Sequence, residues 1–227
     1  MSNKILIKNA RIINEGTSLI KDILIEGSII SKIDTEINVL SSVNIINAEG
    51  LTLIPGMIDD QVHFREPGLT HKGDIFSESR AAIAGGVTSF IEMPNTIPNT
   101  TNNSALNEKI EIAKSKSFAN FSFMFGGTNY NLDDILSVDD NNIAGIKLFL
   151  GSSTGNMLID NHKVIEEIFR NTKLPISVHC EDEYIIKKNL INYINKYGDD
   201  IPIDLHPEIR NEEACYKSSK FAIELAK

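Results

Sequence analysis

Residues 58–68, with the sequence IDDQVHFREPG, determine how the rest of the chain is interpreted. Apolar residues lead into this stretch, and a Pro-Gly pair ends any regular element directly after it. The pattern predicts a buried strand whose carboxyl end opens onto a loop carrying His63, Arg65 and Glu66. Because α/β barrels place their chemistry at the carboxyl ends of the strands, this loop is a candidate functional site.

Three further segments have the pattern of such strand ends: residues 93–96 (MPNT), 145–149 (GIKLF) and 178–181 (VHCE). The second of them contains Lys147 within an otherwise apolar strand, where a lysine needs a partner or a lowered pKa. A neutral amine in a dry site can react with carbon dioxide, and the resulting carbamate can bridge two metal ions. Lys147 is therefore a candidate metal-site residue.

Two histidines, His63 and His179, also lie at predicted strand ends. Each of them alone is more simply interpreted as a packed, hydrogen-bonded side chain. Together with Lys147 they favour a metal site, and zinc suits a set of nitrogen and oxygen ligands. Arg65 and Asn95 suggest recognition of an anion, since a guanidinium matches a carboxylate. The alternatives are an ion pair between Arg65 and its neighbour Glu66, and an ordinary turn at Asn95.

The order of predicted elements divides the chain into residues 1–54 and 55–227. The first part contains short β-branched clusters separated by turns, which predicts a small antiparallel sheet or half-sandwich. The second part alternates strands and helices, which predicts a parallel sheet with right-handed crossovers. The expected strands are 52–64, 87–93, 121–125, 144–150 and 176–179, and the expected helices 73–86, 104–116, 132–136, 161–171, 182–197 and 207–227.

Composition excludes several classes of protein. Lys and Arg total 22 against 31 Asp and Glu, a net charge of −9 with no basic block, which argues against a nucleic-acid surface. No stretch reaches the roughly 20 apolar residues of a membrane span, and the first residues lack the apolar core of a signal peptide. The two cysteines, Cys180 and Cys215, do not suggest a disulfide framework. A cytoplasmic protein without a membrane partner is expected.

The motifs PGMID (55–59), HFREPG (63–68), AGGVT (84–88) and MPNT (93–96) resemble dihydroorotase, the cyclic amidase of pyrimidine synthesis in the amidohydrolase superfamily. GIK, VHCE and RNEEA further along the chain continue the likeness, which covers nearly all of it. Arg65 within HFREPG, with Asn95 after Met-Pro, favours dihydroorotase over its allantoinase and hydantoinase relatives. The resemblance implies a metal-dependent TIM barrel preceded by an amino-terminal β domain.

The resemblance also implies roles for individual residues. His63, His179 and a carboxylated Lys147 would be ligands of one or two zinc ions, and Arg65 and Asn95 would hold the substrate carboxylate. Zinc would lower the pKa of water and polarise the amide carbonyl. Dihydroorotate and N-carbamoyl-aspartate would then be interconverted.

Two departures from the family pattern stand out. Gln61 occupies the position of a family histidine, and an amide oxygen is a weaker zinc ligand than an imidazole. The family's sixth-strand metal histidine and eighth-strand catalytic Asp would lie beyond residue 227, so no catalytic acid or base is identified in this chain.

A closed barrel of eight strands takes about 250 residues, whereas residues 55–227 supply five βα units. We therefore expect a fragment of a longer enzyme, or a chain whose barrel is completed by a partner chain, that is poorly folded and nearly inactive alone. A homo-oligomer is the other expected assembly. A non-catalytic scaffold, and another cyclic amidase such as a hydantoinase or allantoinase, are the alternatives. The number of bound metal ions distinguishes dihydroorotase from a scaffold, which need bind none. The effect of Arg65→Ala on the binding of a carboxylate-bearing substrate distinguishes it from the other amidases.

Overall fold

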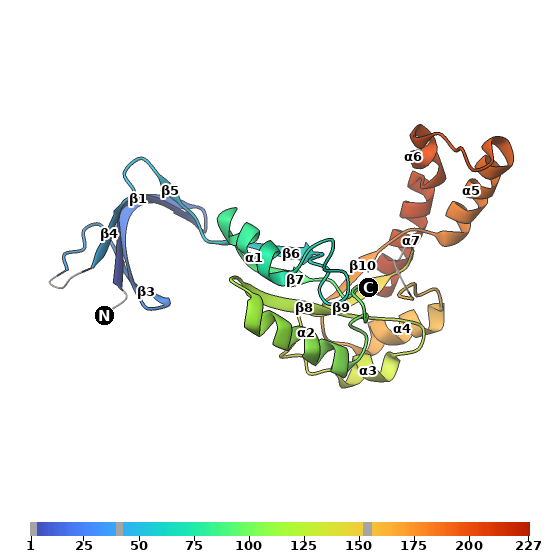
Figure 1. Ribbon diagram of the computed structural model, residues 1–227, viewed down its shortest axis with the longest axis horizontal. Coiled ribbons are helices and arrows are strands. Elements are labelled where there is room, and N and C mark those ends of the chain that lie inside the picture. The colour runs from blue at the N-terminus through green and yellow to red at the C-terminus, as the bar shows by residue number, and fades with distance from the viewer. Residues whose placement is uncertain (1–3, 40–42, 152–155) are drawn as a thin grey trace. The chain divides into compact units, whose positions relative to one another are not determined.

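The computed structural model describes residues 4–39, 43–151 and 156–227. The chain divides into two compact units, Met1–Gly56 and Met57–Lys227, and each is described by itself (Figure 1). Sequence patterning predicts the division two residues earlier. No helix within the described ranges combines the length and the apolar character needed to cross a membrane.

The first unit is a five-stranded sheet in the order β3-β2-β1-β4, with β5 also paired to β1. The β1–β2 and β2–β3 pairs are antiparallel, while β4 and β5 lie parallel to β1. The predicted antiparallel sheet is therefore mixed. Its strands are β1 (Lys4–Asn14), β2 (Thr17–Glu26), β3 (Ile29–Asp34), β4 (Asn44–Asn47) and β5 (Thr52–Leu53).

Two separate β-branched clusters at the start of the chain form one strand, β1. Its pairing with β2 shifts register between Ile7 and Ala10, and Asn9 lies in the left-handed region at φ 61°. The Asn9 backbone N–H donates to the buried Asp22 carboxylate over 2.9 Å, and Ile37 N–H donates to the same side chain over 3.0 Å. A bulge, satisfied by a carboxylate from the neighbouring strand, therefore joins the two clusters.

The second unit is a parallel sheet in the order β10-β9-β8-β7-β6 with helices between its strands, as the alternating pattern predicts. Its strands are β6 (Met57–Val62), β7 (Val87–Glu92), β8 (Asn120–Gly126), β9 (Gly145–Phe149) and β10 (Ile176–His179). Its helices are α1 (Ile75–Ala84), α2 (Asn103–Lys116), α3 (Leu132–Ser137), α4 (His162–Asn171), α5 (Glu183–Tyr197), the 3-10 turn η1 (Ile203–Leu205), α6 (His206–Ile209) and α7 (Glu212–Leu225).

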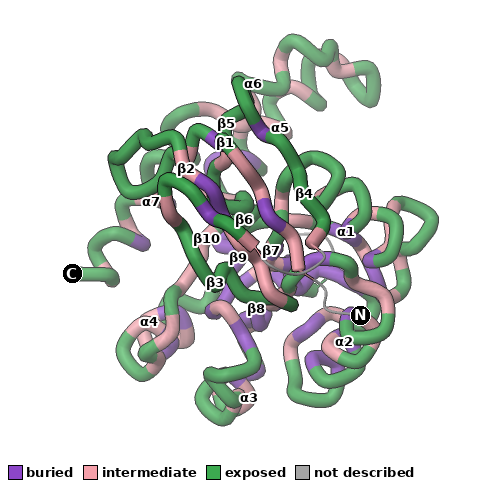
Figure 2. Tube along the Cα trace, turned by 90° about the vertical axis from the view of Figure 1, so that its left-hand side faces the viewer, coloured by how far each residue is buried: buried purple, intermediate pink, exposed green. Residues whose placement is uncertain are grey.

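The main core lies between this sheet and its helices. It combines aromatic residues of the strands, such as Phe90 and Phe123, with apolar residues of α1, α2, α3, α4 and α7. Strand β9 is buried along its whole length, whereas five of the six residues of β6 are exposed (Figure 2). Side chains alternate at the end of β6: Val62 and Phe64 pack into the core, which leaves Gln61 and His63 for the opposite face of the sheet.

Two expected elements are divided in the structure. The strand expected over 52–64 splits, because Thr52–Leu53 pairs with β1 in the first unit while Met57–Val62 pairs with β7. The helix expected over 207–227 breaks between α6 and α7. There the extended backbone of Asn211 places its side-chain oxygen to accept the Ala214 N–H, so that a new helix begins.

Candidate functional site

The parallel strands all run in one direction, so their carboxyl ends lie at the same edge of the sheet. His63 follows β6, Asn95 lies three residues after β7, Lys147 lies in β9 and His179 ends β10. We call these four residues and Arg65 the strand-end cluster. The topology thus brings the loops predicted to carry the site to one side of the sheet.

Lys147 is only 3% exposed, and it is the one charged residue in a strand that is otherwise apolar. Its Nζ lies 3.4 Å from Gln61 Oε1 and 3.4 Å from Ser177 Oγ, which come from β6 and β10. The Phe149 ring centre is 5.3 Å away. Burial lowers the pKa of Lys147, against an opposing contribution from Cys180. The lysine is therefore placed between two polar side chains and has a lowered pKa, as its sequence context requires.

His63 interacts with several members of the cluster. Partial burial lowers its pKa, and the positive charge of Arg65 lowers it further. A hydrogen bond with the Asn95 side chain opposes these effects, while the charges of Lys147 and Lys109 add to them. The lowered pKa favours the neutral imidazole, which is the form that binds a metal. Arg65, Asn95 and Lys147 thus all act on one histidine.

Glu66 does not play the role of ion-pair partner to Arg65 that the simpler interpretation assigns to it. Its side chain is buried, pairs with Lys116 of α2, and accepts the Ile75 N–H over 2.9 Å at the start of α1. The Arg65 backbone N–H is 3.4 Å from an oxygen of Glu92. Hydrogen bonds and an ion pair of the Glu66 and Glu92 side chains therefore hold the loop after β6, independently of the Arg65 guanidinium.

His179 has different partners. Its Nε2 lies 3.0 Å from Glu181 Oε2, and Arg210 pairs with the same carboxylate oxygen. Burial acts to raise the pKa of Glu181, but its bonds to His179 and Arg210 outweigh this effect and lower it. The His179 ring centre is 6.4 Å from that of Phe149. His179 therefore lies at the expected strand end, with its ring nitrogen engaged by a carboxylate.

The residues can be tested against the zinc that the family resemblance implies. Within the described ranges, no group of three or more His, Cys, Asp or Glu side chains is placed to hold a metal ion. His63 and Lys147 nevertheless suit the role, because both have lowered pKa values and Gln61 Oε1 adjoins the lysine. His179 would have to give up Glu181 to join them. The donor set fits a metal at the His63–Lys147 side of the site.

Sequence reasoning missed three polar residues near the site: Ser177, Glu92 and Lys109. Ser177 alternates with the apolar side chains of β10, and Glu92 ends the apolar strand β7. Lys109 lies on the buried stripe of α2 with Ala105 and Ala113, at helical spacing. In each case the available signal was a polar residue at a position that periodicity assigns to a packed face.

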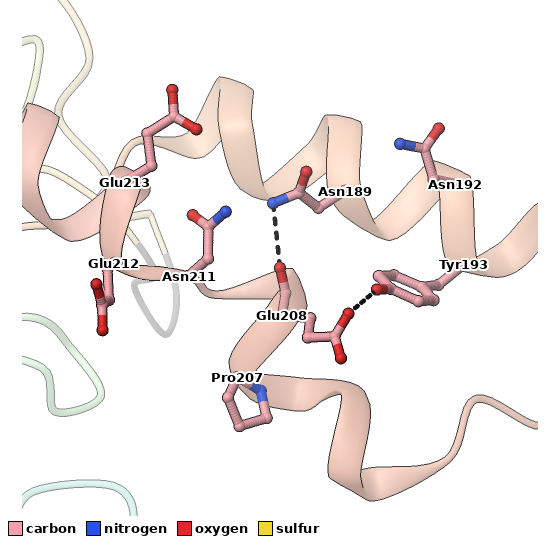
Figure 3. A pocket seen from close by; sticks show the side chains of 8 residues that line it. All are labelled: Asn189, Asn192, Tyr193, Pro207, Glu208, Asn211, Glu212 and Glu213. Carbon is pink, nitrogen blue, oxygen red and sulfur yellow. Dashed lines mark hydrogen bonds between the residues drawn. The ribbon is translucent and has the colours of Figure 1, made fainter.

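Two of the cavities in the described part of the second unit differ in their relation to the strand-end cluster. One of about 700 Å³ borders His179 and Cys180 and is otherwise largely apolar. Another, of about 500 Å³, lies between α5 and α6, where Tyr193 donates to Glu208 and the Asn189 amide donates to the Glu208 carbonyl over 3.3 Å (Figure 3). No member of the strand-end cluster lines the second cavity, so it is separate from the candidate site.

A mixed β unit followed by a five-stranded parallel sheet with helices defines a partial α/β barrel, with Lys, His, Arg and Asn side chains gathered toward the carboxyl ends of its strands. In structure the chain is similar to L-hydantoinase from Arthrobacter aurescens, with a TM-score of 0.91 and 26% identity over 99% of this chain and 50% of that one. A dihydropyrimidinase from Brevibacillus agri shows the same fold, with a TM-score of 0.82. The predicted half of a TIM barrel is confirmed.

In sequence the chain is 34% identical to a dihydroorotase from Methanosarcina acetivorans, over 96% of this chain and 46% of the relative. It is 35% identical to an allantoinase from Salmonella choleraesuis, over 71% of this chain and 35% of the relative. No family model matches it. The chain is a homologue of the cyclic amidohydrolases, the dihydroorotases, allantoinases and hydantoinases, and spans about half the length of the dihydroorotases it matches.

Proposed function

We propose that this chain forms the amino-terminal part of a dihydroorotase site, which interconverts dihydroorotate and N-carbamoyl-aspartate. The observation that carries the proposal is the buried Lys147, whose Nζ lies 3.4 Å from Gln61 Oε1, together with His63, which hydrogen-bonds the Asn95 side chain and feels the charge of Arg65. It combines a cation and an amide suited to a carboxylate with a lysine and an imidazole suited to a metal. The 34% identity to a dihydroorotase over nearly the whole chain supports it.

Arg65 and Asn95 would bind the ring carboxylate of the substrate. The guanidinium supplies paired donors in a plane, and the Asn95 amide supplies a further donor from the neighbouring loop. Asn95 is buried and adjoins His63, so a carboxylate held there would lie beside the metal-binding side chains. This arrangement gives a substrate with a carboxylate an advantage over a neutral cyclic amide.

His63 and Lys147 would hold zinc, with Lys147 carboxylated and Gln61 Oε1 beside it. The lowered pKa of Lys147 favours the neutral amine, which is the form that reacts with carbon dioxide. Zinc bound there would lower the pKa of a water molecule and polarise the amide carbonyl. His179 would join as a ligand after exchanging its contact with Glu181. No general acid or base is proposed within this chain.

The proposal is tested by steady-state kinetics on the protein purified as its source makes it. We expect turnover of dihydroorotate, and a roughly 10- to 100-fold rise in KM for Arg65→Gln, because hydrogen bonds between charged groups contribute about 1.5–3 kcal/mol. Arg170→Gln is the matched control, since Arg170 is 65% exposed and pairs with Glu167 on α4. This control should leave KM unchanged.

The allantoinase relatives, which are 35% identical over 71% of this chain, define the rival function. Allantoin and hydantoin lack a carboxylate, so preferred turnover of either, insensitive to Arg65→Gln, would replace dihydroorotase by that activity. A protein that binds no zinc and turns over none of the three substrates would instead be a scaffold.

A further inference from the structure

Lys109 is a charged residue on the buried face of α2. Its side chain is 0% exposed, and it lies four residues from both Ala105 and Ala113 on the stripe that packs against the sheet. An amine there loses its hydration, so each of its protons needs an acceptor. The contacts of this side chain therefore show what it does in the fold.

The three protons of the Lys109 ammonium have three acceptors. Nζ pairs with the Glu92 carboxylate, donates to the Met93 carbonyl over 2.8 Å, and lies 3.4 Å from Thr100 Oγ1. Met93 and Thr100 flank the loop that carries Asn95, and Thr100 N–H also donates to the Pro94 carbonyl. Lys109 thus ties both ends of the Asn95 loop to α2.

Glu92 extends the same contacts to the loop that carries Arg65. One of its oxygens lies 3.4 Å from the Arg65 backbone N–H. Arg65 has φ 71°, a left-handed conformation that costs a residue with a β-carbon energy and needs support from its surroundings. The support comes from a carboxylate that is 1% exposed and whose charge is balanced by Lys109.

We propose that Lys109, acting through Glu92, is a positioning residue that fixes the Arg65 loop relative to the Asn95 loop and so sets the affinity for a carboxylate-bearing substrate. The proposal rests on the proposed function for its substrate. A buried ion pair contributes little net stability compared with an apolar pair of the same volume, which leaves loop placement as the role for this one.

The variant Glu92→Leu/Lys109→Met removes both charges together and leaves no buried ion unpaired. We expect KM for dihydroorotate to rise roughly tenfold, with kcat changed by less than about threefold, because binding geometry is lost and the metal-side residues are untouched. Glu92→Gln/Lys109→Met keeps an oxygen for the Arg65 N–H and should recover part of the loss. The matched control is Glu111→Gln/Lys114→Met, an exposed pair at 2.7 Å on the same helix.

Hydrogen exchange of the Arg65 amide, followed by mass spectrometry, is the second readout and needs no turnover. We expect faster exchange in Glu92→Leu/Lys109→Met than in the wild type or the control. Faster exchange in a protein that does not turn over dihydroorotate would overturn the proposed function and retain the loop placement. Unchanged exchange, or a kcat loss without a KM rise in an active enzyme, would overturn the positioning role of Lys109.

Discussion

Lys147 shows at the scale of one residue why a polar side chain in a core indicates function. The residue is 3% exposed, and the neighbours of its amine, Gln61 and Ser177, are neutral groups at 3.4 Å. Neutral partners do not replace the hydration of a full charge, so its pKa falls. Burying this side chain is unfavourable, and its neutral partners offset little of the lost hydration. Its burial is therefore better explained by a ligand that it binds than by a contribution to stability.

Lys147→Met tests this view of the residue. We expect the free energy of unfolding to rise by about 1 kcal/mol, or to stay unchanged, because an apolar side chain of similar length replaces a desolvated amine. Bound zinc should fall to background at the same time. Urea unfolding and elemental analysis measure the two effects, with the exposed Lys114→Met as control. A loss of stability above about 2 kcal/mol would show that Lys147 is mainly structural.

At the scale of the element, the N-cap residue of helix α5 also connects this helix to α7. Asp182 is the N-cap and accepts the Ile185 N–H over 3.0 Å, while its other oxygen pairs with Lys217 of α7 at 2.8 Å. Its backbone N–H donates to the Ala214 carbonyl over 3.0 Å, at the start of α7. One residue thus joins the end of the loop after β10 to two helices.

The ion pair of Asp182 should make stability depend on pH. Burial acts to raise the pKa of Asp182, but Lys217 and the N-cap bonds outweigh it, so the pKa of this carboxyl in the folded protein is below its ordinary value. A carboxyl of this kind stabilises the fold above its unfolded pKa, and the contribution disappears as the pH falls through the folded pKa. Asp182→Asn keeps the cap and loses the charge.

We therefore expect Asp182→Asn to be less stable than the wild type at pH 7, by roughly 0.5–1 kcal/mol for a partly exposed pair, and equally stable at about pH 2. Urea unfolding across this range measures the difference. Lys187→Gln, which removes the 3.6 Å pair with Glu183 on the same helix, is the control for an exposed charge. A difference that stays constant with pH would show that the charge of Asp182 does not stabilise the fold.

At the scale of the whole molecule, the parallel sheet has two edge strands, each paired with a neighbour on one side only. Among the described residues, β6 pairs with β7 and β10 pairs with β9. Apolar side chains are exposed beside both strands, with Ile58 at 68% and Met57 at 56% on β6, and Ile223 of α7 at 58% near β10. Open edges flanked by apolar surface promote association between chains.

We expect the 227-residue chain, purified alone, to self-associate beyond the monomer at micromolar concentrations. Met57→Lys/Ile58→Lys should shift it toward the monomer, because charges on an edge strand oppose pairing between chains. Light scattering after size-exclusion chromatography measures the mass. Tyr130→Lys is the control, since Tyr130 is 95% exposed in a loop outside the sheet. A monomeric wild type would show that these edges do not drive association.

Local patterns determined much of this protein. The strand–helix alternation of the second unit and the alternation that separates Val62 from His63 follow from periodicity and turn residues. So do the positions of Arg65 and Asn95 just after strands and of Lys147 within a buried strand. The motifs in the sequence also indicated the similarity to dihydroorotases that the sequence comparison shows.

The tertiary structure decided which side chains meet. Gln61 and Lys147 are 86 residues apart in the chain, and their contact depends on the registers between strands. Periodicity placed Lys109 on a packed face, but only the packing of α2 on the sheet gave it Glu92 and the Asn95 loop as partners. Spacing along a chain fixes the face on which a side chain lies, whereas its partners depend on how distant elements pack.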